Sequence, residues 1–235
     1  MPQSIGNCTR LQKVALAGNE LTSLPLEMSQ CKNLELLRIS ANRIQELPSW
    51  LMTLPKLSWL AYSDNPCSIN HKNNFELPEI SWHQFELKEK LGEGASGIIS
   101  KALWANETKR LDVAVKVFKG EVTSDGLPLS EMNRCVASTG HKNLVKLLGK
   151  IKDHPQQKEG LVFELIPPEY KNLGNPPSFV TCTRDTYPND TTFTLNNLMQ
   201  IIIDTASVSA HLHNRGIMHG DFYAHNMMFN EDATI

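Results

Sequence analysis

A period of 23 residues in the amino-terminal third constrains the fold of this chain more than any other feature. Leu11, Leu34 and Leu57 mark the starts of three successive copies. The copies follow the pattern L-x-x-L-x-L-x-x-N-x-L-x-x-L-P, from which the third copy departs at Pro66. A unit this short cannot bury its apolar face alone, so a fixed period of roughly 20 to 50 residues predicts a stack whose neighbouring copies share one core.

The pattern resembles the leucine-rich repeat, in which a short strand lines a concave face and the asparagine side chain satisfies backbone groups of the turn. Strand positions between the core residues then point to the concave surface. This places Lys13, Leu36 and Trp59 in one column and Ala15, Arg38 and Ala61 in another. Leu36, Trp59 and Arg38 are therefore candidates to bind a protein ligand on the concave face. The alternative is that the adjoining domain covers them.

The five cysteines are spread along the chain without a C-x-x-C pair, which indicates neither a disulfide framework nor a zinc site. Cys8 and Cys31 share the repeat phase of Leu54, so we expect them to stack inside the solenoid as small apolar residues. A reducing compartment is the simpler interpretation, and we expect a cytoplasmic protein.

Charge and hydropathy argue against two classes of partner. The formal net charge of −2 gives no electrostatic case for binding nucleic acid or an anionic membrane surface. The amino terminus lacks the basic and apolar regions of a signal peptide, and no window approaches about 18 uncharged apolar residues. Residues 66–81 are polar and contain two prolines, so we interpret them as a linker and expect no membrane span.

Residues 91–116 combine a glycine loop with a lysine in an apolar strand. Gly92, Gly94 and Gly97 form a Gly-x-Gly-x-x-Gly pattern, which tight turns and dinucleotide-binding folds also contain. Here β-rich residues follow the third glycine, where a dinucleotide-binding fold starts a helix, so we expect the loop to join two antiparallel strands. A third strand is predicted at residues 111–118, with valines on one face and Lys116 on the other. A lysine in this apolar setting needs an anionic partner.

The GEGASG loop followed by VAVK resembles the small lobe of a protein kinase. The resemblance implies that Lys116 bridges nucleotide phosphates and a glutamate on the next helix. Glu131 is the candidate glutamate, on a helix whose Met132, Cys135 and Val136 form an inward stripe. The alternative is a surface glutamate on an amphipathic helix. The nucleotide-binding residues that the resemblance implies are Gly92, Glu93, Gly94, Ala95, Ser96, Gly97, Ile99, Ala114, Lys116, Phe163, Glu164 and Ile166.

Residues 143–150 and 161–166 are short apolar runs that we expect to pair as antiparallel strands and complete a five-stranded sheet. In the kinase resemblance the second of these strands ends at the hinge between the lobes. Phe163 then lies beside the adenine pocket, and residues 164–166 offer backbone groups to the base. The alternative is an ordinary buried strand without a ligand.

The segment that follows divides into an irregular part and a helix. Residues 167–193 contain five prolines and little periodicity, so we expect a surface excursion and draw no function from it. Residues 194–214 show helical spacing. The inward stripe is predicted at Leu195, Leu198, Ile202, Ala206, Ser209 and Leu212 or His213.

The segment IMHGDFYAHN is similar to the H-R-D-L-x-x-x-N catalytic loop of protein kinases. The resemblance implies that Asp221 orients the substrate hydroxyl and accepts its proton, and that Asn226 binds magnesium. Gly220 replaces the arginine of the pattern, so we expect no switch through a phosphorylated activation loop. Tyr223 matches neither the serine/threonine nor the tyrosine kinase pattern, which leaves the hydroxyl class open. We expect His225 to be structural rather than a metal ligand.

The chain stops at Ile235 before any D-F-G, activation-loop or A-P-E segment, so we expect a kinase that is truncated at its carboxyl end. The predicted fold is an α/β leucine-rich-repeat solenoid followed by an α+β protein-kinase-like domain, with a complete small lobe and a partial large lobe. We assign residues 1–67 to the repeats, 68–81 to the linker and 82–235 to the kinase-like domain.

The predicted function is transfer of the γ-phosphate of ATP, with Mg²⁺, to a hydroxyl of a protein substrate, with serine or threonine preferred to tyrosine. The fragment by itself is expected to be inactive. The alternative is a pseudokinase or scaffold that binds nucleotide and a partner without catalysis. Occupied positions for the lysine, the glutamate, the aspartate and the asparagine favour the enzyme.

Overall fold

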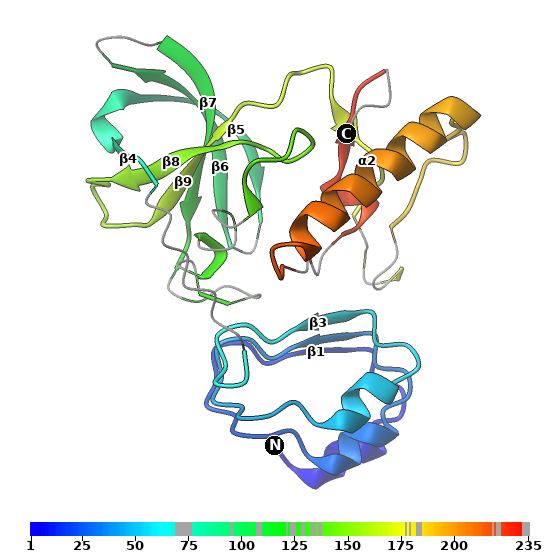
Figure 1. Cartoon of the computed structure of the whole chain (residues 1–235). Coiled ribbons are helices and arrows are strands. Elements are labelled where there is room, and N and C mark those ends of the chain that lie inside the picture. The colour runs from blue at the N-terminus through cyan, green and yellow to red at the C-terminus, as the bar shows by residue number, and fades with distance from the viewer. Residues whose placement is uncertain are drawn as a thin grey trace.

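The computed structural model describes residues 1–68, 77–94, 96–106, 110–120, 122, 126–127, 130–132, 135, 138–176, 178, 180–181, 185–217, 219 and 222–231. Figure 1 shows a repeat region at the amino terminus, a twisted sheet and a long helix near the carboxyl terminus. The strands of the repeats lie on the side that faces the rest of the chain.

The repeat region is a three-stranded parallel sheet in the order β1-β2-β3. Lys13 pairs with Leu36 and Leu36 with Trp59, so the two predicted columns of side chains are confirmed. A 3-10 helix connects each turn on the opposite side of the repeats (Figure 1). The elements are η1 (Gln3–Asn7), β1 (Lys13–Ala15), η2 (Leu26–Gln30), β2 (Leu36–Arg38), η3 (Ser49–Thr53) and β3 (Trp59–Ala61).

The repeat asparagines satisfy backbone groups of two adjacent repeats. The backbone N–H of Leu21 donates to Oδ1 of Asn42 at 3.0 Å. Nδ2 of Asn42 donates to the carbonyls of Leu16 and Ile39, both at 2.9 Å. Asn65 makes the corresponding bonds one repeat further on. This ladder connects neighbouring repeats through buried polar groups that would otherwise lack partners.

The cysteines of the repeats differ from the prediction at one position. Cys31 is fully buried in the repeat core with Leu54. Cys8 is exposed, although it has the same repeat phase. The prediction for Cys8 was wrong because this residue lies at the end of the described stack, where one side of it meets solvent.

The second sheet has six strands in the order β4-β8-β9-β7-β6-β5, where five were predicted. The glycine loop joins β5 and β6, which are antiparallel as predicted. The pair β8 and β9 is also antiparallel as predicted. The strands are β4 (Glu79–Ser81), β5 (Phe85–Glu93), β6 (Gly97–Ala105), β7 (Arg110–Phe118), β8 (Leu147–Lys152) and β9 (Gly160–Glu164), and η4 (Trp82–Gln84) lies between β4 and β5.

The sixth strand comes from the end of the predicted linker. Residues 79–81 form β4, parallel to β8, with Ile80 opposite Ile151. Ile80 is buried, and the backbone N–H of Lys150 donates to the carbonyl of Pro78 at 3.0 Å. A Cβ atom at position 149 would lie 2.6 Å from that carbonyl oxygen, so Gly149 permits the close approach. The assignment of these residues to a linker was therefore wrong.

The two faces of β7 build two separate cores. Val113 and Val115 pack on one face with Ile80 and Ile151. Phe118 lies on the other face. Its core also contains Met132, Leu147 and Leu161. The alternation predicted for this strand is confirmed, and it leaves Lys116 on the same face as Phe118.

The long helix α2 (Leu195–His213) begins as predicted but buries a stripe that shares only Leu212 with the predicted one. The Thr194 side chain accepts a hydrogen bond from the backbone N–H of Asn197, an N-cap. The buried residues of the helix are Ile201, Asp204, Val208 and Leu212. Of the predicted inward residues, Leu195, Leu198 and Ile202 are exposed. Both stripes have helical spacing, and packing against Leu144, Ile217 and Phe222 selects the buried one.

Short elements complete the described part of the chain. β10 (Lys171–Asn172) pairs with β11 (Met228–Phe229), so the segment predicted to be irregular contains one short strand. η5 (Ala224–Asn226) precedes β11. None of the helices among the described residues combines the length and the apolar character needed to cross a membrane.

Candidate active site

The glycine loop is closed by backbone hydrogen bonds. The N–H of Gly94 donates to the carbonyl of Gly97 at 3.0 Å, and the N–H of Lys119 donates to the carbonyl of Ser96 at 3.1 Å. A Cβ atom at Gly97 would lie 2.6 Å from the carbonyl oxygen of Val117. Around Gly92 and Gly94 nothing lies within 4 Å of such an atom. Gly97 thus brings β6 against β7, and the other two glycines leave bare backbone over open space.

Glu93 attaches the loop to the sheet. Its carboxylate contacts Nζ of Lys119 at 2.5 Å and Nζ of Lys90 at 3.0 Å. The hydrogen bonds from Lys119 and then Lys90, with the charge of both lysines, lower the pKa of Glu93 to about 2. The carboxylate is therefore ionised at neutral pH, so one end of the loop is attached to the end of β7.

Lys116 and Glu131 form an ion pair. Lys116 lies on β7, and Glu131 lies between Ser130 and Met132, which are helical as well. Met132 is buried in the core under this face of the sheet, and that packing turns Glu131 toward the strand. The Lys116 ammonium also lies 5.1 Å from the centre of the Phe118 ring. Of the predicted stripe, Met132 and Cys135 pack inward, and Val136 lies outside the described residues.

The Lys116 side chain runs beside the glycine loop. A Cβ atom at Gly97 would lie 3.3 Å from Cε of Lys116. Ile99 on β6 is directly opposite Lys116 in the strand register. The lysine, its carboxylate partner and the third glycine of the loop therefore meet on one face of the sheet.

The residues expected near the adenine base lie on the paired strands β7 and β9 and just beyond β9. Ala114 is opposite Phe163 in the register of β7 and β9. Phe163 packs against the core that contains Met132, and Ile166 is half-buried beyond the end of the strand. The N–H of Glu164 donates to the carbonyl of Lys146 at 2.9 Å. An adenine base at this position would therefore contact the backbone carbonyl of Glu164 or the backbone of the residues that follow it.

The predicted catalytic loop is described only in part. Asp221 and Gly220 lie outside the described residues, as does Ala95 of the glycine loop. Asn226 is exposed at the end of η5, and its N–H donates to the carbonyl of Tyr223 at 3.0 Å. The side chain that was expected to bind magnesium is thus on the surface of this segment.

Asp185 holds the loop segment, a role that no sequence pattern indicated. One carboxylate oxygen contacts Nδ1 of His225 at 2.5 Å, and the other accepts the N–H of Ala224 at 2.6 Å. Nδ2 of Asn172 also donates to the carbonyl of His225 at 2.9 Å. His225 is therefore a structural residue, as predicted. Asp185 comes from a segment without periodicity, so no pattern could have indicated its role.

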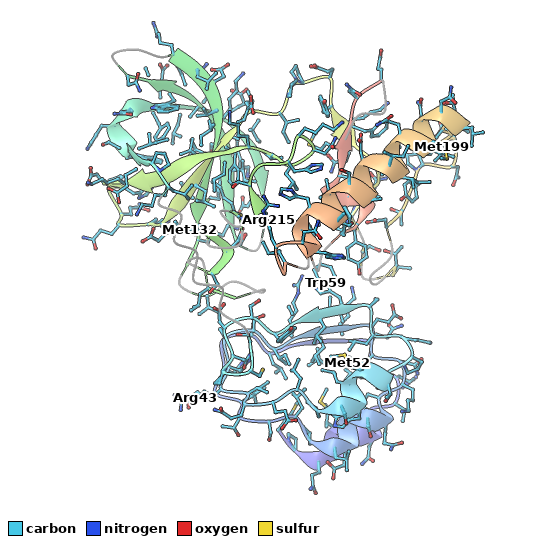
Figure 2. The ribbon with its side chains drawn as sticks, viewed as in Figure 1. Arg43, Met52, Trp59, Met132, Met199 and Arg215 are labelled. Carbon is cyan, nitrogen blue, oxygen red and sulfur yellow. The ribbon has the colours of Figure 1, made fainter. Side chains whose placement is uncertain are left out.

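The third repeat contacts this site at two points. The rings of Trp59 and Tyr223 lie 5.6 Å apart, and the Tyr223 hydroxyl donates to the carbonyl of Ser58 at 3.4 Å. Figure 2 shows Trp59 on the side of the repeats that faces the rest of the chain. Of the two alternatives for Trp59, the structure shows a contact with the adjoining domain. Arg38 lies over the Trp59 ring at 4.6 Å, and Leu36 is buried.

A cavity of about 350 Å³ opens on the other face of the sheet. Val115 and Val117 line it together with Trp82 and His154. These valines alternate with Lys116 along β7, so the cavity and the lysine lie on opposite faces. The cavity is therefore separate from the candidate active site.

Comparison with known proteins identifies both parts of the chain. Residues 85–235 match the family model of the protein tyrosine and serine/threonine kinase domain, and residues 9–66 match that of the leucine rich repeat. The chain is 27% identical over 158 residues to the tyrosine-protein kinase receptor TYRO3 of Danio rerio, an alignment that covers 63% of this chain and 17% of the relative.

Two further relatives give similar figures. The tyrosine-protein kinase receptor TYRO3 of Mus musculus is 26% identical over 167 residues, covering 70% of this chain and 19% of the relative. The angiopoietin-1 receptor of Danio rerio is 25% identical over 167 residues, covering 66% and 14%. The chain thus spans less than a fifth of the length of these curated relatives.

Proposed function

Because this chain belongs to the protein tyrosine and serine/threonine kinase family, we propose that it binds ATP with magnesium and serves the transfer of the γ-phosphate to a protein hydroxyl. The observation that carries this proposal is the ion pair of Lys116 with Glu131 beside the glycine loop. Phosphoryl transfer depends mainly on positioning and on fixed positive charge near the phosphates.

The residues present fit a bound nucleotide. Gly92 and Gly94 present backbone without a nearby side chain, so a phosphate group can approach their N–H groups closely. Glu131 holds the Lys116 side chain on this face of the sheet, which places a cation next to the loop. Magnesium bound with the help of Asn226 would screen the negative charge of the phosphates.

Asp221 has the role of orienting the acceptor hydroxyl and accepting its proton in this proposal. The support is the motif match alone, since Asp221 lies outside the described residues. The contacts of Asp185 with Ala224 and His225 hold these two residues, which follow Asp221 in the chain, in place. These contacts fix one end of the segment on which the aspartate lies.

The class of acceptor is the finer part of the proposal. A serine or threonine acceptor was expected from the sequence, whereas two of the relatives compared above are named tyrosine-protein kinase receptors. The matched family model includes both kinds of enzyme. Phosphoamino acid analysis of a mixed protein substrate decides between them, because it separates phosphotyrosine from phosphoserine and phosphothreonine.

Substitution of Lys116 by methionine tests the proposed function. Lys116→Met, made in the full-length protein, removes the cation at nearly constant volume, and we expect phosphate transfer from labelled ATP to fall by about 100-fold or more. Lys150→Met is the matched control, because Lys150 lies on β8 of the same sheet, with β9 between it and β7, and pairs with Glu79 at 2.9 Å. The control should change transfer by less than about two-fold.

Three results are informative. Transfer that depends on Lys116 and not on Lys150 supports the kinase. Binding of ATP without any transfer by the full-length protein supports the scaffold alternative and contradicts the enzyme. Equal transfer by both variants removes Lys116 from the mechanism and overturns the proposal.

We further propose that the protein acts in the cytoplasm and that its repeats bind a protein partner. The match of residues 9–66 to the leucine rich repeat supports the second part, since such faces commonly bind proteins. Fractionation of cells that produce the tagged protein tests the location. Recovery in the membrane or secreted fraction would contradict it.

A further inference from the structure

Asp64, in the turn after the third repeat strand, contacts the segment that carries Glu131. Its Oδ2 accepts a hydrogen bond from the backbone N–H of Leu127 at 2.7 Å. Its Oδ1 accepts a hydrogen bond from the hydroxyl of Ser130. A residue of the repeats thus caps the beginning of a helical segment in the kinase domain. In most helices an N-cap residue of the helix itself has this role.

Both partners are shaped for this contact. Asp64 has φ of 60°, a left-handed conformation that aspartate tolerates better than most side chains. Gly126 has φ of 132°, which only glycine adopts readily. A Cβ atom on Gly126 would overlap Oδ2 of Asp64, and Ser63 Cβ would lie 3.3 Å away. The glycine therefore makes room for the carboxylate of the repeat.

The capped segment leads directly to the ion pair. The N–H of Glu131 donates to the carbonyl of Leu127 at 3.1 Å, so the first turn connects the capped N–H with the glutamate. Ser130 is next to Glu131 in the chain. Glu131 in turn pairs with Lys116 on β7. A chain of direct contacts therefore runs from the third repeat to the lysine beside the glycine loop.

We propose that Asp64 is a positioning residue for Glu131. Through this residue the repeats control whether the Lys116–Glu131 ion pair of the kinase domain forms. This inference rests on the proposed nucleotide site. When the repeat turn is docked, its carboxylate holds the first turn of the helical segment and Glu131 points at Lys116. When a partner draws the repeats away, the first turn loses two hydrogen bonds and the glutamate loses its fixed position.

The Trp59 contact supports the same assignment. Trp59 on β3 and Asp64 in the following turn belong to one repeat, and the Trp59 ring packs, tilted, against the ring of Tyr223 in the catalytic-loop segment. One repeat therefore contacts both the helical segment that carries Glu131 and the loop segment that precedes Asn226. Movement of this repeat would act on both at once.

The test combines substitutions at Asp64 with a substitution at Glu131. Asp64→Gly removes the carboxylate and keeps the backbone unstrained at positive φ, whereas Asp64→Asn keeps one oxygen acceptor. We expect the Kd of Mg-ATP to rise by about 5- to 10-fold in Asp64→Gly and by about two-fold in Asp64→Asn. In a protein that already carries Glu131→Gln, Asp64→Gly should raise the Kd of Mg-ATP by less than about a further two-fold, because both changes act through one interaction.

Amide hydrogen exchange of residues 127–131 gives a readout that does not depend on nucleotide. Asp64→Gly should accelerate exchange at Leu127 and Glu131 by about 5-fold or more, in the same protein without ATP. Glu20→Gly is the matched control, since Glu20 is an exposed carboxylate of the repeats that pairs with Arg43 at 2.6 Å. Arg43 lies on a side of the repeats away from the rest of the chain (Figure 2). The control should alter neither the exchange nor the Kd.

The outcomes separate this inference from the proposed function. Faster exchange together with a weaker, Glu131-dependent Kd supports the positioning role. An unchanged Kd in Asp64→Gly, or a full effect that persists in Glu131→Gln, overturns it. If the unsubstituted protein does not bind Mg-ATP at all, the proposed function fails, and the positioning role fails with it even where exchange is faster.

Discussion

At the scale of single residues, Gly97 determines how closely the glycine loop approaches the lysine strand. A Cβ atom there would lie 2.6 Å from the Val117 carbonyl oxygen, and that oxygen belongs to the rigid sheet. Gly97→Ala should therefore destabilise the fold by about 1 to 3 kcal/mol and weaken ATP binding. Gly94→Ala is the control for stability, because open space surrounds that position. Thermal unfolding measures both variants, and equal unfolding temperatures would contradict the close approach.

His141 predicts a dependence of stability on pH. Its Nδ1 accepts the N–H of Asn143 at 3.1 Å, which requires an unprotonated nitrogen. Burial, and then the charges of His211 and Lys142, lower the pKa of His141 below its usual value of 6.5. The unfolded chain thus takes up a proton at higher pH than the folded chain does, so the folded state loses stability as the pH falls through and below 6.5.

The measurement is the midpoint of urea unfolding at pH 7.5 and at pH 5.5. The midpoint should be lower at the acidic pH, and His141→Gln should reduce the difference. His154 also has a lowered pKa, from burial and then from Lys158, so part of the difference will persist in the variant. A difference of the same size in His141→Gln would show that His141 does not contribute to it.

At the scale of elements, the asparagine ladder gives a prediction about the repeats. Asn42 is only 6% exposed and bonds to both adjacent repeats. Asn42→Ala leaves buried backbone groups unpaired and should lower the free energy of unfolding by about 2 to 3 kcal/mol. Asn19 is exposed and its side chain bonds to the carbonyls of Leu16 and Ala17, so Asn19→Ala should cost less than about 1 kcal/mol. Chemical unfolding checks both values, and a larger loss at Asn19 would refute the argument.

The helix α2 shows what periodicity can and cannot decide. The apolar spacing predicted its extent within one residue at each end, and Thr194 supplies the expected kind of cap. The helix has apolar residues on two stripes, and Leu198 and Ile202 on the predicted stripe are 41% and 58% exposed. Spacing was equally good for both, so only the position of the packing partners, Leu144 and Phe222 among them, selected the other.

The edge strand β4 and the short strand β10 also depend on tertiary contacts rather than on local sequence. Residues 79–81 are too few and too polar to predict a strand from the sequence. They form one because β8 has a free edge for pairing and Gly149 lets Pro78 approach closely. β10 forms because β11 lies beside it. Strand pairs between residues far apart in sequence depend on the whole fold, which local propensity does not report.

At the scale of the whole molecule, the contact between the repeats and the kinase domain predicts coupled unfolding. The rings of Trp59 and Tyr223 pack against each other, and Lys13 donates to the carbonyl of Ser178 at 3.4 Å. Trp59→Ala should lower the unfolding temperature of the kinase domain by about 3 °C, because an aromatic pair contributes about 1 kcal/mol. Arg43→Ala, at an exposed ion pair of the repeats, is the control. Scanning calorimetry measures both, and equal shifts would show that the contact is energetically neutral.

The sequence by itself determined the repeat period, the register of the repeat strands, the antiparallel strands around the glycine loop and the alternation of β7, because all of these follow from regular spacing along one segment. With the kinase resemblance it also indicated Lys116 and Glu131, which the structure places in contact. Only the tertiary structure decided which stripe of α2 is buried, which residue holds His225, and that Asp64 caps the segment of Glu131. These depend on contacts between residues from 40 to 63 positions apart, or on which surface packs against a helix, and no local pattern encodes such a choice.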